Sequence, residues 1–158
     1  MRARTHSEQE TEALGVRLAH ARPETGSLAV LYLEGDLGAG KTTFARGFAR
    51  AAGVTATVRS PTYTLLELYP ASDGTLVHLD LYRMRAPAEL DTLGLREWAA
   101  PNHVWLIEWP ERGAGRLPAA DLRLRFSGSA SGHDIEASAA SALGAAWLVQ
   151  LESGARTP

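Results

Sequence analysis

A glycine-rich stretch carries the clearest chemistry in this sequence. The residues from Gly35 to Thr43 fit the phosphate-binding spacing G-x-x-x-x-G-K-T. Glycines lack a Cβ, so the backbone can turn tightly and bring its N–H groups close to phosphate oxygens. In such a loop the Lys41 ammonium reaches the β- and γ-phosphates, and the Thr42 hydroxyl can bind Mg²⁺. The stretch therefore predicts a site for a nucleoside triphosphate with Mg²⁺.

Lysine usage supports this interpretation. The chain has 16 basic residues, and Lys41 is the only lysine among them. Lysine carries a compact ammonium charge whereas arginine carries a planar guanidinium, so the two are not interchangeable at a phosphate. The residues of this stretch that we predict to bind the nucleotide are Gly35, Asp36, Leu37, Gly38, Ala39, Gly40, Lys41, Thr42 and Thr43.

The segments on either side of the loop have the patterns of a strand and a helix. Leu28 to Glu34 is apolar on both faces at its centre, as a strand inside a parallel sheet should be. Phe44 to Ala52 has a helical pattern, and Gly53 follows as a helix stop. A helix that begins after the loop adds its free N–H groups and the positive end of its dipole to the phosphate site.

Two acidic residues that end apolar runs could complete the site. Val104 to Ile107 leads into Glu108, and Leu76 to Leu79 leads into Asp80. The carboxyl ends of parallel strands meet at one edge of an α/β sheet, beside such a loop. A carboxylate there is costly without a charged or hydrogen-bonding partner, which Mg²⁺ and Lys41 would supply. We therefore predict that Lys41, Asp80 and Glu108 form the catalytic group.

Other polar residues near these strands allow more than one interpretation. His78 shares a strand face with Asp80, and a packed strand histidine is favoured over a catalytic base. Thr62 and Thr64 follow a Ser-Pro turn, where a threonine can read Mg²⁺ and the γ-phosphate or can simply begin a strand. Trp109 follows the second acidic residue and could pack near the nucleotide. Three arginines could stabilise transition-state charge, and nothing in the sequence selects among Arg83, Arg112 and Arg116.

The rest of the chain predicts further elements of an α/β domain. Ser7 and Glu10 fit a capping box, so a first helix is expected to run to about Ala21. The other expected elements are a hairpin of Tyr63–Tyr69 and Thr75–Tyr82, short helices at Pro87–Gly94 and Leu95–Ala100, a strand at His103–Pro110, a loop at Glu111–Pro118, a strand at Leu122–Phe126, a turn at Ser127–His133, a strand near Ile135 and a helix at Ala142–Leu151.

These elements predict one P-loop NTPase-like domain over residues 1–158, with an ordered core at about 7–151. We expect a three-layer α/β fold whose central sheet is mostly parallel, with antiparallel strands added. The last few residues are expected to fray.

Composition restricts the classes of function. The chain has 158 residues, a formal net charge of −2 and no basic run, so nucleic-acid binding by the chain alone is not supported. It has no cysteine, which excludes disulfides, thiolate metal sites and a thiol nucleophile. Its five histidines show no metal-ligand spacing. Since neither a signal core nor a membrane-length apolar run is recognisable, we expect a cytoplasmic protein that does not bind a membrane.

Several motifs together resemble one protein family. They are the stretch Gly35–Thr43, S-P-T-Y-T at Ser60–Thr64, H-L-D-L-Y-R at His78–Arg83, Glu89-Leu90 with Gly94-Leu95, and I-E-W-P-E at Ile107–Glu111. In this order, and over the chain from about Ser7 to Leu151, they resemble the bacterial TsaE (YjeE) family. Many families share the first motif, whereas the D-L-Y-R and I-E-W-P-E motifs beside S-P-T-Y-T are much more specific.

The resemblance implies a small cytosolic ATPase that uses ATP and Mg²⁺. It would act in the threonylcarbamoyl modification of adenosine in tRNAs that read codons starting with A. Its implied partner is a TsaB–TsaD complex, whose repeated turnover ATP hydrolysis supports. The family member does not transfer the threonylcarbamoyl group itself, and it reaches tRNA only indirectly.

The resemblance also implies roles for single residues. Lys41 would bind phosphate, and Thr42 and Glu108 would bind Mg²⁺. Asp80 would orient the attacking water, although the roles of the two acids could be reversed. Three further positions are placed by the resemblance: Thr62 in a switch loop, Thr11 near the base, and His133 where the family commonly has an arginine near the nucleotide.

Alternative functions remain open on the sequence alone. A small P-loop metabolite kinase needs the same loop, but it would usually carry an arginine-rich lid. A nucleotide-gated binding module could use the same residues with slow hydrolysis. A GTPase is disfavoured because its N-K-x-D motif needs a second lysine, and a transporter-type ATPase because a Leu-Ser-Gly-Gly signature is absent.

Overall fold

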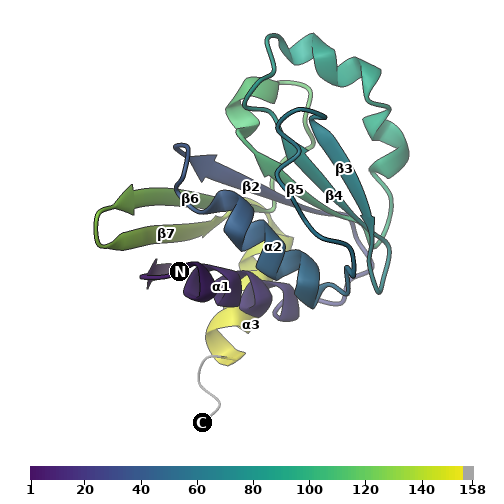
Figure 1. The fold of residues 1–158 in the computed structure, drawn as a ribbon. Helices are drawn as coiled ribbons and strands as arrows, with labels where there is room; N and C mark the ends of the chain where they lie inside the picture. Colours follow the sequence, from purple (N-terminus) through teal and green to yellow (C-terminus); the bar gives the residue numbers. More distant parts are fainter. Residues whose placement is uncertain (155–158) are drawn as a thin grey trace.

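One twisted sheet organises the computed structural model, which describes residues 1–154 (Figure 1). In this part of the chain seven strands follow the order β1-β7-β6-β2-β5-β4-β3 across the sheet. Their bounds are Arg2–Thr5 for β1, Ala29–Gly35 for β2, Leu66–Pro70 for β3, Thr75–Asp80 for β4, Val104–Glu108 for β5, Leu122–Ser129 for β6 and Gly132–Ala139 for β7.

The middle of the sheet is parallel and its margins are antiparallel. β2 pairs in parallel with β5 and β6, and β5 pairs in parallel with β4. The outer pairs β3–β4, β6–β7 and β1–β7 are antiparallel. The predicted α/β class, with a mostly parallel central sheet and added antiparallel strands, is therefore confirmed. The register sets Asp80 beside Glu108 and Glu108 beside Leu33, so both acids lie next to the strand that enters the glycine-rich loop.

Helices lie on both faces of the sheet. The α-helices α1 (Glu8–His20), α2 (Lys41–Ala51) and α3 (Ala142–Gly154) share one buried cluster with the sheet, and Figure 1 shows α1 beside α2. Phe48 and Trp147 bring α2 and α3 together, with ring centroids 6.2 Å apart. On the other face the short 3₁₀-helices η1 (Pro87–Thr92), η2 (Leu95–Trp98) and η3 (Pro110–Gly113) lie where a third layer of α-helices would be expected.

Two glycines bring α1 and α2 into close contact. A Cβ added to Gly15 would collide with the carbonyl of Phe44, and a Cβ added to Gly47 would collide with the carbonyl of Glu12. Both obstacles are backbone atoms, so neither can rotate away as a side chain would. The close approach fixes α2, and with it the end of the glycine-rich loop, against α1.

We expect Gly47→Ala to lower the free energy of unfolding by about 2 kcal/mol, because overpacking outweighs the better helix propensity of alanine. Gly154→Ala is the matched control, since it is also helical but an added Cβ there meets nothing within 4 Å. Urea unfolding of both variants measures the difference. Equal stability changes in the two variants would contradict the close helix contact.

The structure corrects several predicted boundaries. The sequence pattern did not predict β1, which joins the sheet by pairing with β7. β3 begins at Leu66 rather than Tyr63, because the residues from Thr62 to Thr64 form a turn. The predicted turn at 127–133 is mostly strand, because β6 ends at Ser129 and β7 begins at Gly132. β7 then pairs with β1 on its other side.

The helices also differ in detail from the prediction. α2 begins at Lys41, three residues before the predicted start, and the helices predicted after Pro87 and Leu95 are 3₁₀-helices. The predicted loop that follows β5 begins with η3. None of the described helices is long and apolar enough to cross a membrane. The residues 155–158, which we expected to fray, lie outside the described part of the chain.

Candidate functional site

The glycine-rich loop turns sharply between β2 and α2. Gly35, Gly38 and Gly40 have φ angles of 143°, 74° and 99°, which residues with a Cβ rarely adopt. At Gly35 an added Cβ would also collide with the carbonyl of Phe126. α2 then begins at Lys41 and leaves its first N–H groups free of helical partners. The loop and this helix start together form an anion-binding arrangement.

The Lys41 side chain folds back over the loop. Its Nζ donates hydrogen bonds to the carbonyl oxygens of Gly35 at 2.5 Å and Asp36 at 2.7 Å, and lies 4.6 Å from the ring centroid of Trp109. Burial lowers the pKa of Lys41, and the carboxylates of Glu108 and Asp80 oppose that shift. A phosphate would offer this buried ammonium a charged partner in place of two neutral carbonyls.

Glu108 is held between α2 and β4. Its Oε1 accepts a hydrogen bond from the Thr42 hydroxyl at 2.9 Å and lies 2.9 Å from Nε2 of His78. His78 is fully buried and its Nδ1 has no hydrogen-bond partner among the described residues. The sequence-based interpretation of His78 as a packed strand histidine did not include this contact, which fixes the direction of the Glu108 carboxylate.

Asp80 faces a different set of hydroxyls. Its Oδ2 accepts hydrogen bonds from Ser60 at 2.6 Å and from Thr62 at 3.0 Å, and these two hydroxyls lie 2.6 Å apart. Its Oδ1 accepts a hydrogen bond from the backbone N–H of Tyr82 at 3.0 Å. Asp80 is therefore hydrogen-bonded to the Ser-Pro turn, whereas Glu108 is hydrogen-bonded to Thr42 at the start of α2.

These groups line one pocket of about 270 Å³. Most of the residues predicted to form the site are there: Thr11, Leu37, Gly38, Ala39, Gly40, Lys41, Thr42, Thr43, Thr62, Asp80, Glu108 and Trp109. Gly35 and Asp36 do not line it, although their carbonyls hold Lys41. Thr64 points elsewhere and donates to Glu67 at 3.2 Å.

Two lining residues, Glu8 and Ser60, were not predicted, and a third, His133, stands where the family resemblance places an arginine near the nucleotide. Ser60 could have been found from its place in the same turn as Thr62. Glu8 precedes Thr11 by one helical turn, which is the only sequence signal for it. His133 lies near Gly40, and its Nδ1 is buried without a hydrogen-bond partner in the described chain. His133 lies on β7, which pairs with both β6 and β1, and the sequence did not predict β1.

The arginines considered as charge stabilisers do not line the pocket. Arg116 pairs with Asp91 at 3.1 Å in an exposed ion pair. The guanidinium of Arg112 lies 5.6 Å from the ring centroid of Trp109, behind the lining. Arg83 lies over the ring of Tyr63 at 4.2 Å.

The site offers hard oxygen ligands of the kind that Mg²⁺ prefers. Among residues 1–154, no group of three or more His, Cys, Asp or Glu side chains could hold a metal ion alone. The Thr42 hydroxyl and the Glu108 carboxylate are in direct contact, which suits an ion that keeps several waters and binds substrate phosphates as well. The residues present therefore fit Mg²⁺ bound together with a nucleotide.

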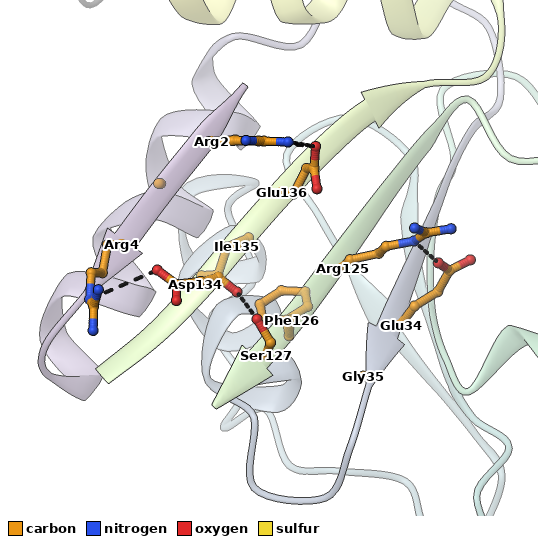
Figure 2. Close-up of a pocket in the computed structure, with 11 residues that line it drawn as sticks. Arg2, Arg4, Glu34, Gly35, Arg125, Phe126, Ser127, Asp134, Ile135 and Glu136 are labelled. Carbon is orange, nitrogen blue, oxygen red and sulfur yellow. Dashed lines mark hydrogen bonds and ion pairs between the residues drawn. The ribbon is translucent and has the colours of Figure 1, made fainter. Parts of the chain in front are cut away.

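A larger hollow of about 760 Å³ lies over the face of β1, β7, β6 and β2 (Figure 2). Its charged side chains are already paired: Arg2 with Glu136, Arg4 with Asp134, and Arg125 with Glu34. Such exposed pairs are typical of a solvated sheet face. We therefore assign the chemistry to the smaller pocket at the glycine-rich loop.

Comparison with known proteins identifies a family for most of the chain. A family model described as "Threonylcarbamoyl adenosine biosynthesis protein TsaE" matches residues 5–135. Proteins named tRNA threonylcarbamoyladenosine biosynthesis protein TsaE are similar to it. The Haemophilus influenzae protein is 42% identical over 76% of this chain and 76% of its own. The Treponema pallidum protein is 35% identical over 84% of this chain and 96% of its own.

A solved structure agrees over nearly the full length. The crystal structure of YdiB from Bacillus subtilis superposes with a TM-score of 0.77 and 31% sequence identity, covering 99% of this chain and 96% of the other. The family resemblance inferred from the motifs is thus confirmed by sequence and by structure. The chain belongs to the TsaE family.

Proposed function

We propose that this chain is a Mg²⁺-dependent ATPase that acts in forming threonylcarbamoyladenosine in tRNA. In this proposal it works through a TsaB–TsaD complex and does not transfer the threonylcarbamoyl group itself. The observation that carries the ATPase part is the convergence of Lys41, Thr42, Asp80 and Glu108 in one pocket. The names of the relatives support the pathway.

The proposed mechanism is in-line attack of water on the γ-phosphorus. The phosphates of ATP would lie along the loop, and Lys41 would exchange the carbonyls of Gly35 and Asp36 for phosphate oxygens. Thr42 and Glu108 would hold Mg²⁺, which would offset the charge that develops on the phosphates. Asp80, which lies beside Glu108 in the sheet, would orient the attacking water.

The part of the pocket beside Gly40 would receive the nucleoside. Thr11 and His133 lie close to Gly40, and Glu8 also lines the pocket. Thr11 is already held there, since its hydroxyl lies 2.8 Å from that of Thr5 on β1. A histidine in this place can stack on a base or donate to it, which is chemistry that an arginine also offers.

ATP hydrolysis by the purified chain, with and without the TsaB–TsaD complex, tests this function. We expect slow hydrolysis by the chain alone and faster hydrolysis with the complex. Slow basal hydrolysis is expected because Asp80 is engaged by two hydroxyls and is not free to orient water. Hydrolysis that ignores the complex but depends on a small hydroxylated metabolite would instead favour a kinase. Binding of ATP with no hydrolysis under either condition would favour a nucleotide-gated binding module.

A further inference from the structure

The segment from Ser60 to Thr64 joins an exposed aromatic side chain to a candidate catalytic carboxylate. Tyr63 is 82% exposed, which is unusual for a large aromatic residue, and it stands at the tip of this turn. Ser60 and Thr62 on the same turn both donate hydrogen bonds to Oδ2 of Asp80. A contact made at Tyr63 is therefore one residue from Thr62 and three residues from Ser60, whose hydroxyls both bind Asp80.

The turn is anchored at its end by a strained residue. Leu65 has a φ of 64°, in the left-handed region that leucine rarely adopts. Its carbonyl accepts a hydrogen bond from the backbone N–H of Asp80 at 3.0 Å, and its N–H donates to the Pro61 carbonyl at 2.7 Å. Such strain persists where the surroundings hold it, and it is common in segments that have two arrangements. The turn is held by a few local hydrogen bonds, so a contact with another molecule could move it to a second conformation.

The exposed tip also has the chemistry of a protein-binding surface. Arg83 stacks on Tyr63, with its guanidinium carbon 4.2 Å from the ring centroid and its Nη2 donating to the Tyr63 hydroxyl at 3.2 Å. Arg83 is exposed, and within residues 1–154 it forms no ion pair with an acidic side chain. Tyrosine and arginine are enriched among the residues that dominate protein–protein binding energies. Leu37, which is 63% exposed, lies on the rim of the same pocket that Ser60 and Thr62 line.

We propose that Tyr63 and Arg83 dock a protein partner, and that docking withdraws Ser60 and Thr62 from Asp80. The partner would present a recess for the tyrosine ring and a carboxylate for Arg83. A protein surface fits better than RNA, because the chain has a net charge of −2 and the adjoining pocket carries acidic groups. This inference rests on the proposed function, and it adds where the partner binds and how binding frees the water-orienting residue.

The test uses the wild-type chain, purified TsaB–TsaD complex, ATP and Mg²⁺, and measures both affinity for the complex and hydrolysis. Tyr63→Ala should weaken the affinity about 30-fold, the effect of a hot-spot residue, and should lose most of the stimulation. Arg83→Ala should act in the same direction, and Tyr63→Phe should retain most of the affinity because it keeps the ring. Val149→Ser is the matched control, since Val149 is also 63% exposed but lies on α3.

Ser60→Ala tests the other end of the segment without the partner. Removing one hydrogen bond to a buried carboxylate should raise partner-free hydrolysis about tenfold and should reduce the further gain on adding the complex. Thermal unfolding of each variant checks that the fold is retained. Ser127→Ala is the control and should leave partner-free hydrolysis unchanged. It removes an exposed serine hydroxyl on β6, which β2 and β5 separate from the strand of Asp80.

The outcomes separate this inference from the proposed function. A wild-type chain that does not hydrolyse ATP, or that ignores the complex, overturns the proposed function and the inference with it. A wild-type chain that responds while Tyr63→Ala and Arg83→Ala respond equally well overturns the inference alone. Unchanged partner-free hydrolysis in Ser60→Ala also overturns it. Loss of tRNA binding in Tyr63→Ala with full affinity for the protein complex would assign the surface to RNA and overturn the docking of a protein.

Discussion

Lys41→Ala is expected to reduce ATP hydrolysis at least about 100-fold, the scale of losing a charge-stabilising donor in a catalytic site. Lys41 is the only lysine or arginine that lines the described pocket, whereas Glu8, Asp80 and Glu108 also line it. The variant would therefore present three carboxylates to a polyanionic substrate. ATP affinity should fall together with the hydrolysis rate, and titration with ATP measures the first loss separately from the second.

Arg50→Ala is the matched control for this variant. It removes one positive charge from the same helix, at an exposed side chain that pairs with Glu12 at 2.9 Å. We expect nearly wild-type hydrolysis, because exposed charges are well screened. Full activity in Lys41→Ala, or an equal loss in Arg50→Ala, would contradict the assignment of the glycine-rich loop as the phosphate site.

Glu108→Gln and Asp80→Asn should fail in different ways. Glu108 contacts the Thr42 hydroxyl and His78, so Glu108→Gln should raise the Mg²⁺ concentration needed for nucleotide binding about 10- to 100-fold. Asp80 contacts the turn hydroxyls, so Asp80→Asn should leave Mg²⁺-dependent binding intact and reduce hydrolysis at least about 100-fold. Titrations with Mg²⁺ and ATP, followed by single-turnover hydrolysis, measure both properties.

Glu34→Gln is the control for these two variants. Glu34 lies one residue before the end of β2, but it pairs with Arg123 and Arg125 on the sheet face and does not line the pocket. It should keep normal Mg²⁺ dependence and hydrolysis. If Mg²⁺ dependence changed in Asp80→Asn alone, Asp80 would be the Mg²⁺ ligand and Glu108 would orient the water. Full activity in either variant would remove that acid from the catalytic group.

The parts of the site that follow local sequence patterns could be predicted. The strand and the glycine spacing are contiguous, so one pattern contains the phosphate loop, although α2 begins at Lys41 and not at the predicted Phe44. Asp80 and Glu108 were predicted for the site because each ends an apolar run, and the parallel β4–β5 register sets them side by side. Each of these predictions needed only the chain near the residue and the general geometry of parallel sheets.

The parts that depend on distant pairing could not be predicted. His133 lies near Gly40 on β7, and the pairing of β7 with β1 could not be predicted because no hydrophobic pattern marks so short a strand as Arg2–Thr5. The contact between His78 and Glu108 depends on side-chain direction across two strands, which spacing along one strand does not give. Thr62 was predicted for the site, but its engagement with Asp80 required the turn that replaces the first residues of the predicted strand.

We propose that ATP hydrolysis at this site supports repeated turnover of the TsaB–TsaD complex. The most direct test counts the modified adenosines formed on tRNA per TsaB–TsaD complex, in the presence of ATP and either the wild-type chain or Lys41→Ala. We expect many modifications per complex with the wild-type chain and about one without it or with the variant. The same number of modifications with and without the wild-type chain would show that this chain does not support repeated turnover.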